Sequence, residues 1–272
     1  MTLYDRFRKA QIKVHKSILH SRENVDLDEV TNVRKYDVCI MSDPYPHVVI
    51  PDFFKPTAYE NLCSVFTEAM RGGLHDKRDY TLDGFHAFDI AYDGYTHSPQ
   101  PTVDPRHPLS IFYSIEWNLF FSKLFNQCTT TETKVVFHYH PAGDKTGSVH
   151  HDHIERSPAI SVPLSNGVIG YKPLTSISQS YTDLTRSSKQ GAAPFQAIAI
   201  LFYLLNDGWH EGDGGETGVY SADRATRLKV VPPINNTLFA FQTSLRSMHT
   251  FQTNRKNRHS IIQWLHAPAK LS

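Results

Sequence analysis

The sequence has few cysteines, no long apolar run and almost no net charge, and each shortage argues against a class of protein. Cys39, Cys63 and Cys128 are widely spaced, which indicates neither a disulfide framework nor a CxxC metal site. The longest apolar run, residues 197–205, is far shorter than the roughly 20 residues of a membrane-spanning helix. Lys plus Arg number 28 against 27 for Asp plus Glu, so no nucleic-acid footprint is indicated. We therefore expect a cytoplasmic protein with neither a nucleic-acid nor a membrane partner.

Histidine, by contrast, is abundant. The 272 residues include 16 histidines, and five of them fall between His138 and His153. The remaining composition, 40% apolar and 20% charged, is ordinary for a globular protein. Because histidine is the commonest metal ligand, the cluster indicates a metal site.

The first 130 residues predict mostly helical support with short entry strands. Tyr59, Leu62, Phe66 and Met70 recur at helical spacing, and Gly72 follows them as a stop signal. The ranges that we expect to form elements are a helix at 3–20, a strand at 47–54, a helix at 57–70, a strand at 86–92 and a helix at 108–126.

From residue 133 to 266 the pattern changes to short β-rich runs, which Gly, Pro, Asn and Asp separate. Such a pattern is typical of an antiparallel sandwich or jelly roll. Residues 154–193 interrupt it with a Ser-, Thr-, Pro- and Gly-rich stretch, which is typical of a lid, a binding loop or disorder. We expect a single domain over 1–272, mainly β, with a jelly-roll core preceded by N-terminal helices.

The segment SVHHDHIE carries the most specific chemistry. In an extended strand, residues i and i+2 point to the same side, so His150 and Asp152 can reach one metal while His151 points away. A third ligand must then come from a distant strand, and His249 follows the apolar run TLFAFQT. Two histidines and one carboxylate form the facial triad that is typical of non-heme Fe(II) oxygenases.

Other histidines compete for this assignment. An HxD pair alone is common, and any one of these histidines could be an ordinary surface residue. His151 and His153 also share a face, and with another ligand they could form a zinc site. His138 and His140 share a face before the turn PAGDKTG, and we interpret them as neighbours of the site or plain strand residues.

Arg258 and Ser260 favour the iron site. They follow His249 closely, open the apolar strand SIIQWL and share one face of it. A guanidinium offers a rigid two-pronged donor to a carboxylate, and a serine hydroxyl beside it can complete the hydrogen bonds. A dicarboxylate that chelates iron at one end needs such an anchor at the other.

The order of the motifs then points to a family. Along the chain come YPHVVIPDFF, the turn YHPAG at 139–143, HxD at 150–152, LFYLLNDGW with GDGGET, PPINNTLFAF before His249, and Arg258-His259-Ser260. Six motifs in this order, over about residues 45–266, resemble the 2-oxoglutarate/Fe(II) oxygenases of the prolyl 4-hydroxylase-like group. Each motif is modest alone, and their order makes the resemblance specific.

The resemblance implies a double-stranded β-helix that binds Fe(II), 2-oxoglutarate and O₂ and releases succinate and CO₂. It also implies that Tyr139 lines the co-substrate pocket and that Tyr203 helps Arg258 bind the distal carboxylate. FYLLNDGW has one more residue between its Tyr and Trp than the common form, so the direction of Tyr203 stays open. Related halogenases carry a small residue where this chain has Asp152, so the carboxylate favours hydroxylation or a related oxidation.

The substrate is indicated less directly. Arg156 and Arg246 lie near the ligands in sequence and could bind an anionic group of a substrate. With no recognition domain and no strong charge patch evident, we expect a small molecule, such as an amino acid or a biosynthetic intermediate. The alternatives are a peptidyl hydroxylase with the same chemistry, a zinc-dependent enzyme, and a sandwich that has lost catalysis.

Overall fold

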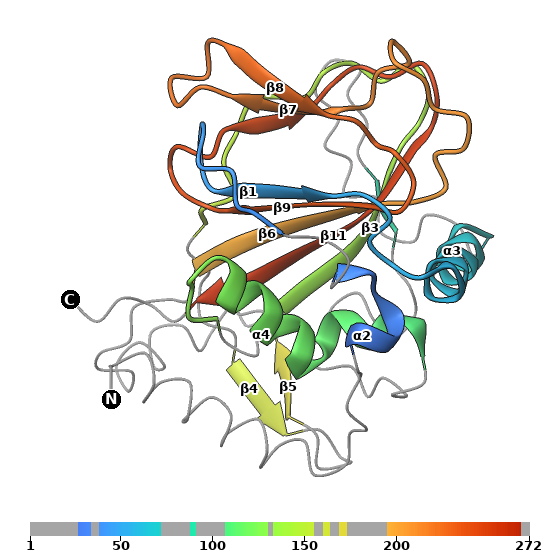
Figure 1. The fold of residues 1–272 in the computed structure, drawn as a ribbon, viewed down its shortest axis with the longest axis vertical. Helices are drawn as coiled ribbons and strands as arrows, with labels where there is room; N and C mark the ends of the chain where they lie inside the picture. The colour runs from blue at the N-terminus through green and yellow to red at the C-terminus, as the bar shows by residue number, and fades with distance from the viewer. Residues whose placement is uncertain are drawn as a thin grey trace, which may run out of the picture.

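The computed structural model describes residues 27–33, 38–71, 88–90, 107–129, 133–154, 160–163, 169–172 and 195–267 (Figure 1). The expected helix at 3–20 and most of the 154–193 insertion lie outside these residues. The helices are α2 (Leu27–Val30), α3 (Pro56–Arg71), the 3₁₀ helix η2 (Pro108–Tyr113) and α4 (Ile115–Leu124). The strands are β1 (His47–Ile50), β2 (Phe88–Ile90), β3 (Thr133–His140), β4 (Ile160–Pro163), β5 (Ile169–Lys172), β6 (Phe195–Tyr203), β7 (Thr217–Tyr220), β8 (Arg227–Val231), β9 (Thr237–Gln242), β10 (His249–Phe251) and β11 (Arg258–Ala267).

The strands form two antiparallel sheets that face each other, with a separate β4–β5 pair in the insertion. The large sheet has the order β1-β9-β6-β11-β3-β2, and the small sheet has the order β10-β7-β8. In Figure 1 the β7–β8 hairpin lies above the large sheet, and α4 lies on its other side. This arrangement confirms the predicted jelly roll. The first half of the chain also supplies β1 and β2, the two edge strands of the large sheet.

The large sheet is buried on both faces. In β6, the even-numbered residues from Ile198 to Phe202 pack in one apolar cluster, and the odd-numbered residues from Ala199 to Tyr203 pack in another. Alternation of side chains along a strand explains this division. It also explains why β6 reads as an unbroken apolar run.

Helices cover one face, and the small sheet covers the other. Phe66 of α3 stacks on Phe137 of β3 with ring centroids 4.7 Å apart. Trp117 of α4 is fully buried, and its indole N–H donates to Gln263 of β11 at 2.7 Å. These contacts confirm helical support for the described helices, and they leave the opposite face of the sheet to form the site.

The predicted helix at 108–126 is in fact two elements. The 3₁₀ helix η2 ends at Tyr113, and Ser114 has an extended backbone with φ −74° and ψ 153°. Its hydroxyl accepts a hydrogen bond from the backbone N–H of Trp117 at 3.2 Å and so caps α4. Both pieces bury apolar side chains, so the apolar pattern runs through the break and does not reveal it.

Packing requires a glycine at position 214, in the Gly-Gly turn between β6 and β7. Gly214 has φ +76°, and a Cβ there would lie 1.9 Å from the carbonyl oxygen of Thr253. Only glycine tolerates both the backbone angle and the contact. Gly215 packs beside the Arg258 side chain, so the turn lies directly against the predicted anchor.

No helix among the described residues is long and apolar enough to cross a membrane.

Candidate metal centre

The HxD segment is held against β10 by backbone hydrogen bonds. His150 and His249 form an isolated antiparallel bridge, in which the N–H of each donates to the carbonyl oxygen of the other at 3.0 and 2.9 Å. The segment thus extends the small sheet by one bridge. Residues that lie opposite each other in an antiparallel bridge have side chains close together, so backbone pairing itself brings the first predicted ligand to the third.

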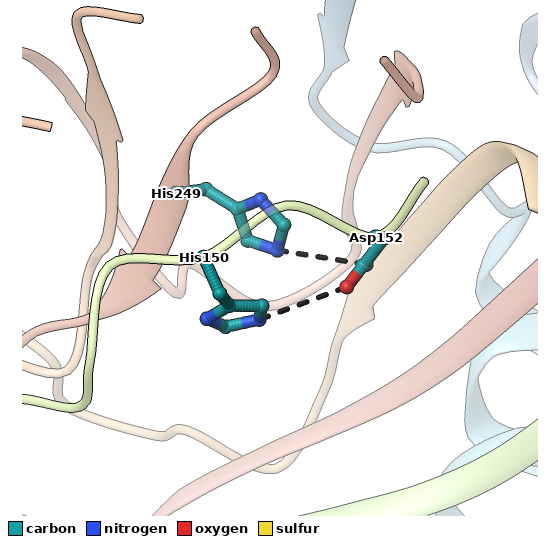
Figure 2. Close-up of side chains that lie close together, drawn as sticks. All are labelled: His150, Asp152 and His249. Carbon is teal, nitrogen blue, oxygen red and sulfur yellow. Dashed lines mark ion pairs between the residues drawn. The ribbon is translucent and has the colours of Figure 1, made fainter. Parts of the chain in front are cut away.

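The three predicted ligands meet in one group. His150, Asp152 and His249 offer ligand atoms that all lie within 4.8 Å of one another. His150 Nε2 is 3.6 Å from Asp152 Oδ1, and His249 Nε2 is 3.5 Å from Asp152 Oδ2. Figure 2 marks both contacts with dashed lines. Among the described residues no other group of His, Cys, Asp and Glu has this geometry. The donor set of two imidazoles and one carboxylate fits Fe(II).

The second nitrogen of each histidine fixes the orientation of its ring. His150 Nδ1 lies 2.8 Å from the carbonyl oxygen of Ser148, and His249 Nδ1 lies 3.1 Å from that of Ser247. Because a carbonyl can only accept, each Nδ1 must carry the proton and donate. Nε2 is then the ligand atom of each neutral ring, on the side of Asp152, which is the orientation that metal-binding histidines need. Burial would lower the pKa of His249, but Asp152 raises it, so a cation at the site would take the place of a proton on that ring.

The electrostatics of Asp152 favour its charged form. Burial alone would raise the pKa of this carboxyl group, but His249, His150 and the indole of Trp264 together hold the pKa well below its usual range. Burial likewise lowers the pKa of His150. At neutral pH the site therefore has one carboxylate and a neutral His150, a protonation state that suits a divalent cation.

The rival pair, His151 and His153, does not join a metal-binding group among the described residues. His153 packs instead against the ring of Phe195, with centroids 5.0 Å apart, and its Nδ1 lies 3.5 Å from the hydroxyl of Thr243.

Arg258 lies buried between the two sheets, with 3% of its surface exposed. One of its terminal nitrogens donates to the hydroxyl of Thr217 at 3.2 Å, and the guanidinium lies 5.1 Å from the ring centroid of Tyr203. Burial lowers the pKa of the guanidinium, and Tyr203 partly offsets that effect. No carboxylate of the described residues pairs with it.

Two buried polar atoms here make no hydrogen bond with the described residues. They are Arg258 Nε and Ser260 Oγ, the two groups predicted to bind the distal carboxylate of the co-substrate. Burying an unpaired charge is costly. An anionic group between the sheets would satisfy both atoms, so the structure fits 2-oxoglutarate at this end of the site.

The side chain of Tyr203 lies on the same face of the large sheet as Arg258 and Ser260. It lies opposite Ser260 in the β6–β11 register, and its hydroxyl is 2.7 Å from that of Thr217. β6 ends at Tyr203, and Leu205 has φ +56°, so the extra residue of FYLLNDGW falls beyond the strand. The insertion therefore leaves the direction of Tyr203 unchanged, and its role in binding stays a prediction.

The expected position of Tyr139 is corrected by the structure. Tyr139 pairs with His259 in the β3–β11 register and stacks on it at 5.2 Å. It packs with the helix-covered cluster, on the face away from the site. By the same register, His138 and His140 share the face of Ser260 and Arg258. His140 stacks on Phe251 of β10 at 3.7 Å, so these two histidines line the site in place of Tyr139.

Trp264 is a site residue that none of the sequence motifs indicates. Its indole N–H donates to Asp152 Oδ2 at 2.9 Å. Strand alternation places it on the same face as Arg258 and Ser260, which was the available signal. Of the two arginines expected near the substrate, Arg246 is exposed in the turn before β10, and Arg156 lies outside the described residues.

Residues 136–266 match the family model of the 2OG-Fe(II) oxygenase superfamily. The matched segment runs from β3 to β11 and contains all three predicted metal ligands, so this part of the chain resembles that superfamily. The family implies Fe(II), 2-oxoglutarate and O₂, which agrees with the cofactors expected from the sequence. No curated protein matches the chain.

Solved structures also resemble the chain. A Pseudomonas putida prolyl-4-hydroxylase matches with a TM-score of 0.53 and 13% identity, over 84% of this chain and 96% of that one. A Trichoplax adhaerens prolyl hydroxylase, in complex with a hypoxia inducible factor peptide fragment, matches with a TM-score of 0.49 and 14% identity, over 82% and 84%. At 13% identity the likeness to the Pseudomonas putida structure supports the fold alone and does not extend to the substrate.

Proposed function

We propose that the protein hydroxylates an unactivated C–H bond of a small molecule, with His150, Asp152 and His249 as the ligands of Fe(II). One observation carries the proposal. The metal-binding group and the buried Arg258, whose Nε has no hydrogen-bond partner among the described residues, lie between the same two sheets, so one site offers a triad at one end and a carboxylate anchor at the other.

Different residues of the site bind the metal and the co-substrate. When bound, Fe(II) supplies the O₂ chemistry, in which 2-oxoglutarate is oxidised to succinate and CO₂ and one oxygen atom enters the substrate. Arg258 and Ser260 hold the distal carboxylate, with Tyr203 and Thr217 fixing the guanidinium. His150, Asp152 and His249 would hold the iron and leave part of its coordination open to 2-oxoglutarate and O₂.

The walls of the site are apolar beside the ligands. Phe241 lies 4.8 Å from His249, and Tyr45 lies 5.7 Å from Phe241, measured between ring centroids. Both rings are buried. These rings shield the His249 side of the metal-binding group from water, which limits side reactions at a reactive centre, while the His150 side chain is 53% exposed.

The proposal of a small substrate rests on charge and on position. The chain has a net charge of +1, so no broad charged surface is indicated for a charged polymer. Arg246 is exposed in the short turn that leads into His249, where its guanidinium can meet an anionic group of a substrate that approaches the metal. Arg156 is proposed for the same role from its place in the sequence.

A substrate screen tests this proposal. Free amino acids, other small carboxylates and short peptides are offered to the Fe(II)-loaded protein with 2-oxoglutarate, and succinate release is measured. We expect a small molecule to stimulate release and its product to gain one oxygen atom. Stimulation by peptides alone would replace the proposal with peptidyl hydroxylation.

A further inference from the structure

Trp264 contacts the carboxylate of the metal-binding group directly. Its indole Nε1–H donates to Asp152 Oδ2 at 2.9 Å, although Asp152 lies in the HxD segment outside the strands, 112 residues earlier in the chain. Trp264 sits near the middle of β11, which is hydrogen-bonded to β6 on one side and β3 on the other. The donor therefore comes from a rigid part of the fold.

The two oxygens of Asp152 have different surroundings. Oδ1 lies 3.6 Å from His150 Nε2. Oδ2 lies 3.5 Å from His249 Nε2 and also accepts the indole hydrogen bond. A hydrogen bond to a carboxylate is charge-assisted and stronger than a neutral one, so the indole distinguishes one oxygen from the other.

We propose that Trp264 is a positioning residue, which holds Asp152 so that a single carboxylate oxygen, Oδ1, faces the metal. This inference rests on the proposed function, because it concerns the same metal. If Oδ2 also bound the metal, Asp152 would occupy a second coordination position. One of the positions needed by 2-oxoglutarate and O₂ would then be lost.

Tryptophan suits this role for two reasons. The indole N–H is only a donor, so it cannot turn to accept and cannot take up a proton as histidine does. The ring also packs against the apolar cluster between the sheets, which includes Leu201 and Ile262. The packing holds the donor in place, so the carboxylate keeps one orientation without a metal.

The test compares Trp264→Phe with Trp209→Phe. The first variant keeps an aromatic ring and removes the donor to Asp152. The second removes an indole hydrogen bond of similar length, 2.8 Å, from Trp209 Nε1 to the carbonyl of Gly214. Co(II) binding is titrated by visible absorption, and 2-oxoglutarate binding to the Co(II)-loaded protein is titrated by calorimetry.

We expect Trp264→Phe to bind Co(II) roughly 10- to 100-fold more weakly, as is typical when a partner of a metal ligand is lost. The Co(II)-loaded Trp264→Phe variant should also bind 2-oxoglutarate more weakly. Trp209→Phe, which changes a contact in the turn beside Arg258 and not at the metal-binding group, should match the wild type in the Co(II) titration. The urea midpoint of the metal-free Trp264→Phe protein should stay near that of the wild type. Trp264→His, which restores an N–H donor, should recover part of the Co(II) affinity.

A second measurement uses the wild-type protein alone. The chain has three tryptophans, so ¹⁵N-labelled tryptophan gives three indole signals. We expect the Trp264 signal to move when Zn(II) is added, more than the other two. Unchanged Co(II) and 2-oxoglutarate affinity in folded Trp264→Phe, or an unmoved Trp264 signal, would overturn the proposal while the proposed function stands. If the wild-type protein bound neither Co(II) nor 2-oxoglutarate, both the role of Trp264 and the proposed function would be contradicted.

Discussion

At the scale of single residues, Arg258 is the most informative side chain. A guanidinium that is 3% exposed without a carboxylate partner among the described residues is costly to the folded protein. Thr217 and the ring of Tyr203 compensate only part of that cost. We expect the remaining cost to favour the binding of an anionic co-substrate at Arg258.

The substitution Arg258→Gln tests this interpretation. Hydrogen bonds to a charged group contribute about 1.5–3 kcal/mol, so the Kd for 2-oxoglutarate should rise roughly 10- to 100-fold. Metal affinity should change little, because Arg258 does not contact the triad. Arg255→Gln, in the exposed loop before β11, is the matched control and should bind 2-oxoglutarate as the wild type does. Equal affinities in the two variants would remove Arg258 from the co-substrate site.

The residues that could be predicted from the sequence are those fixed by strand alternation. His150 with Asp152, and Arg258 with Ser260, follow from the two-residue period and need no register. Tyr139 was assigned from its motif, and the β3–β11 register placed its neighbours His138 and His140 on the site face instead. A register between distant strands is not visible in a single sequence.

At the scale of elements, the turn before β7 supports the anchor. Gly214 forms an isolated bridge with Asn254, and the N–H of Gly215 donates to Thr253 at 3.0 Å. The turn therefore packs against the loop between β10 and β11. That loop connects the distal ligand to Arg258, so the turn helps to set the distance between metal and anchor.

Gly214→Ala should disturb this element. The added Cβ would lie 1.9 Å from a backbone oxygen at φ +76°, so we expect a loss of at least about 2–3 kcal/mol in the free energy of unfolding. Gly208→Ala, at φ +63° with open space around it, carries only the backbone strain, about 1 kcal/mol. Urea denaturation measures both. Similar midpoints for the two variants would show that the contact with Thr253 relaxes at little cost.

The sequence predicts some of the helices and strands and does not reveal the boundaries of others. Helix α3 and the strands from β6 onward were found because their apolar periods are regular. The break at Ser114 was missed because burial continues through it. The same limit applies to Trp264, which reads as one more apolar residue in a buried strand, although its indole N–H contacts a ligand.

At the scale of the whole molecule, the two faces of the large sheet have different roles. One face packs on the helices and gives rigidity, and the other faces the small sheet and holds the site. β11 lies near the middle of the large sheet and contributes Arg258, Ser260 and Trp264 to that face. One strand thus aligns the co-substrate anchor with the metal ligands across the site.

The most direct test of the central claim is succinate release from 2-oxoglutarate in the presence of Fe(II), measured for the wild type, His249→Ala and His153→Ala. The account predicts that His249→Ala loses 2-oxoglutarate turnover because the triad is broken. His153→Ala should keep turnover, because His153 lies outside the triad and contacts Phe195 and Thr243. Near-wild-type succinate release by folded His249→Ala, or its loss in folded His153→Ala alone, would contradict the assignment of His150, Asp152 and His249 as the iron ligands.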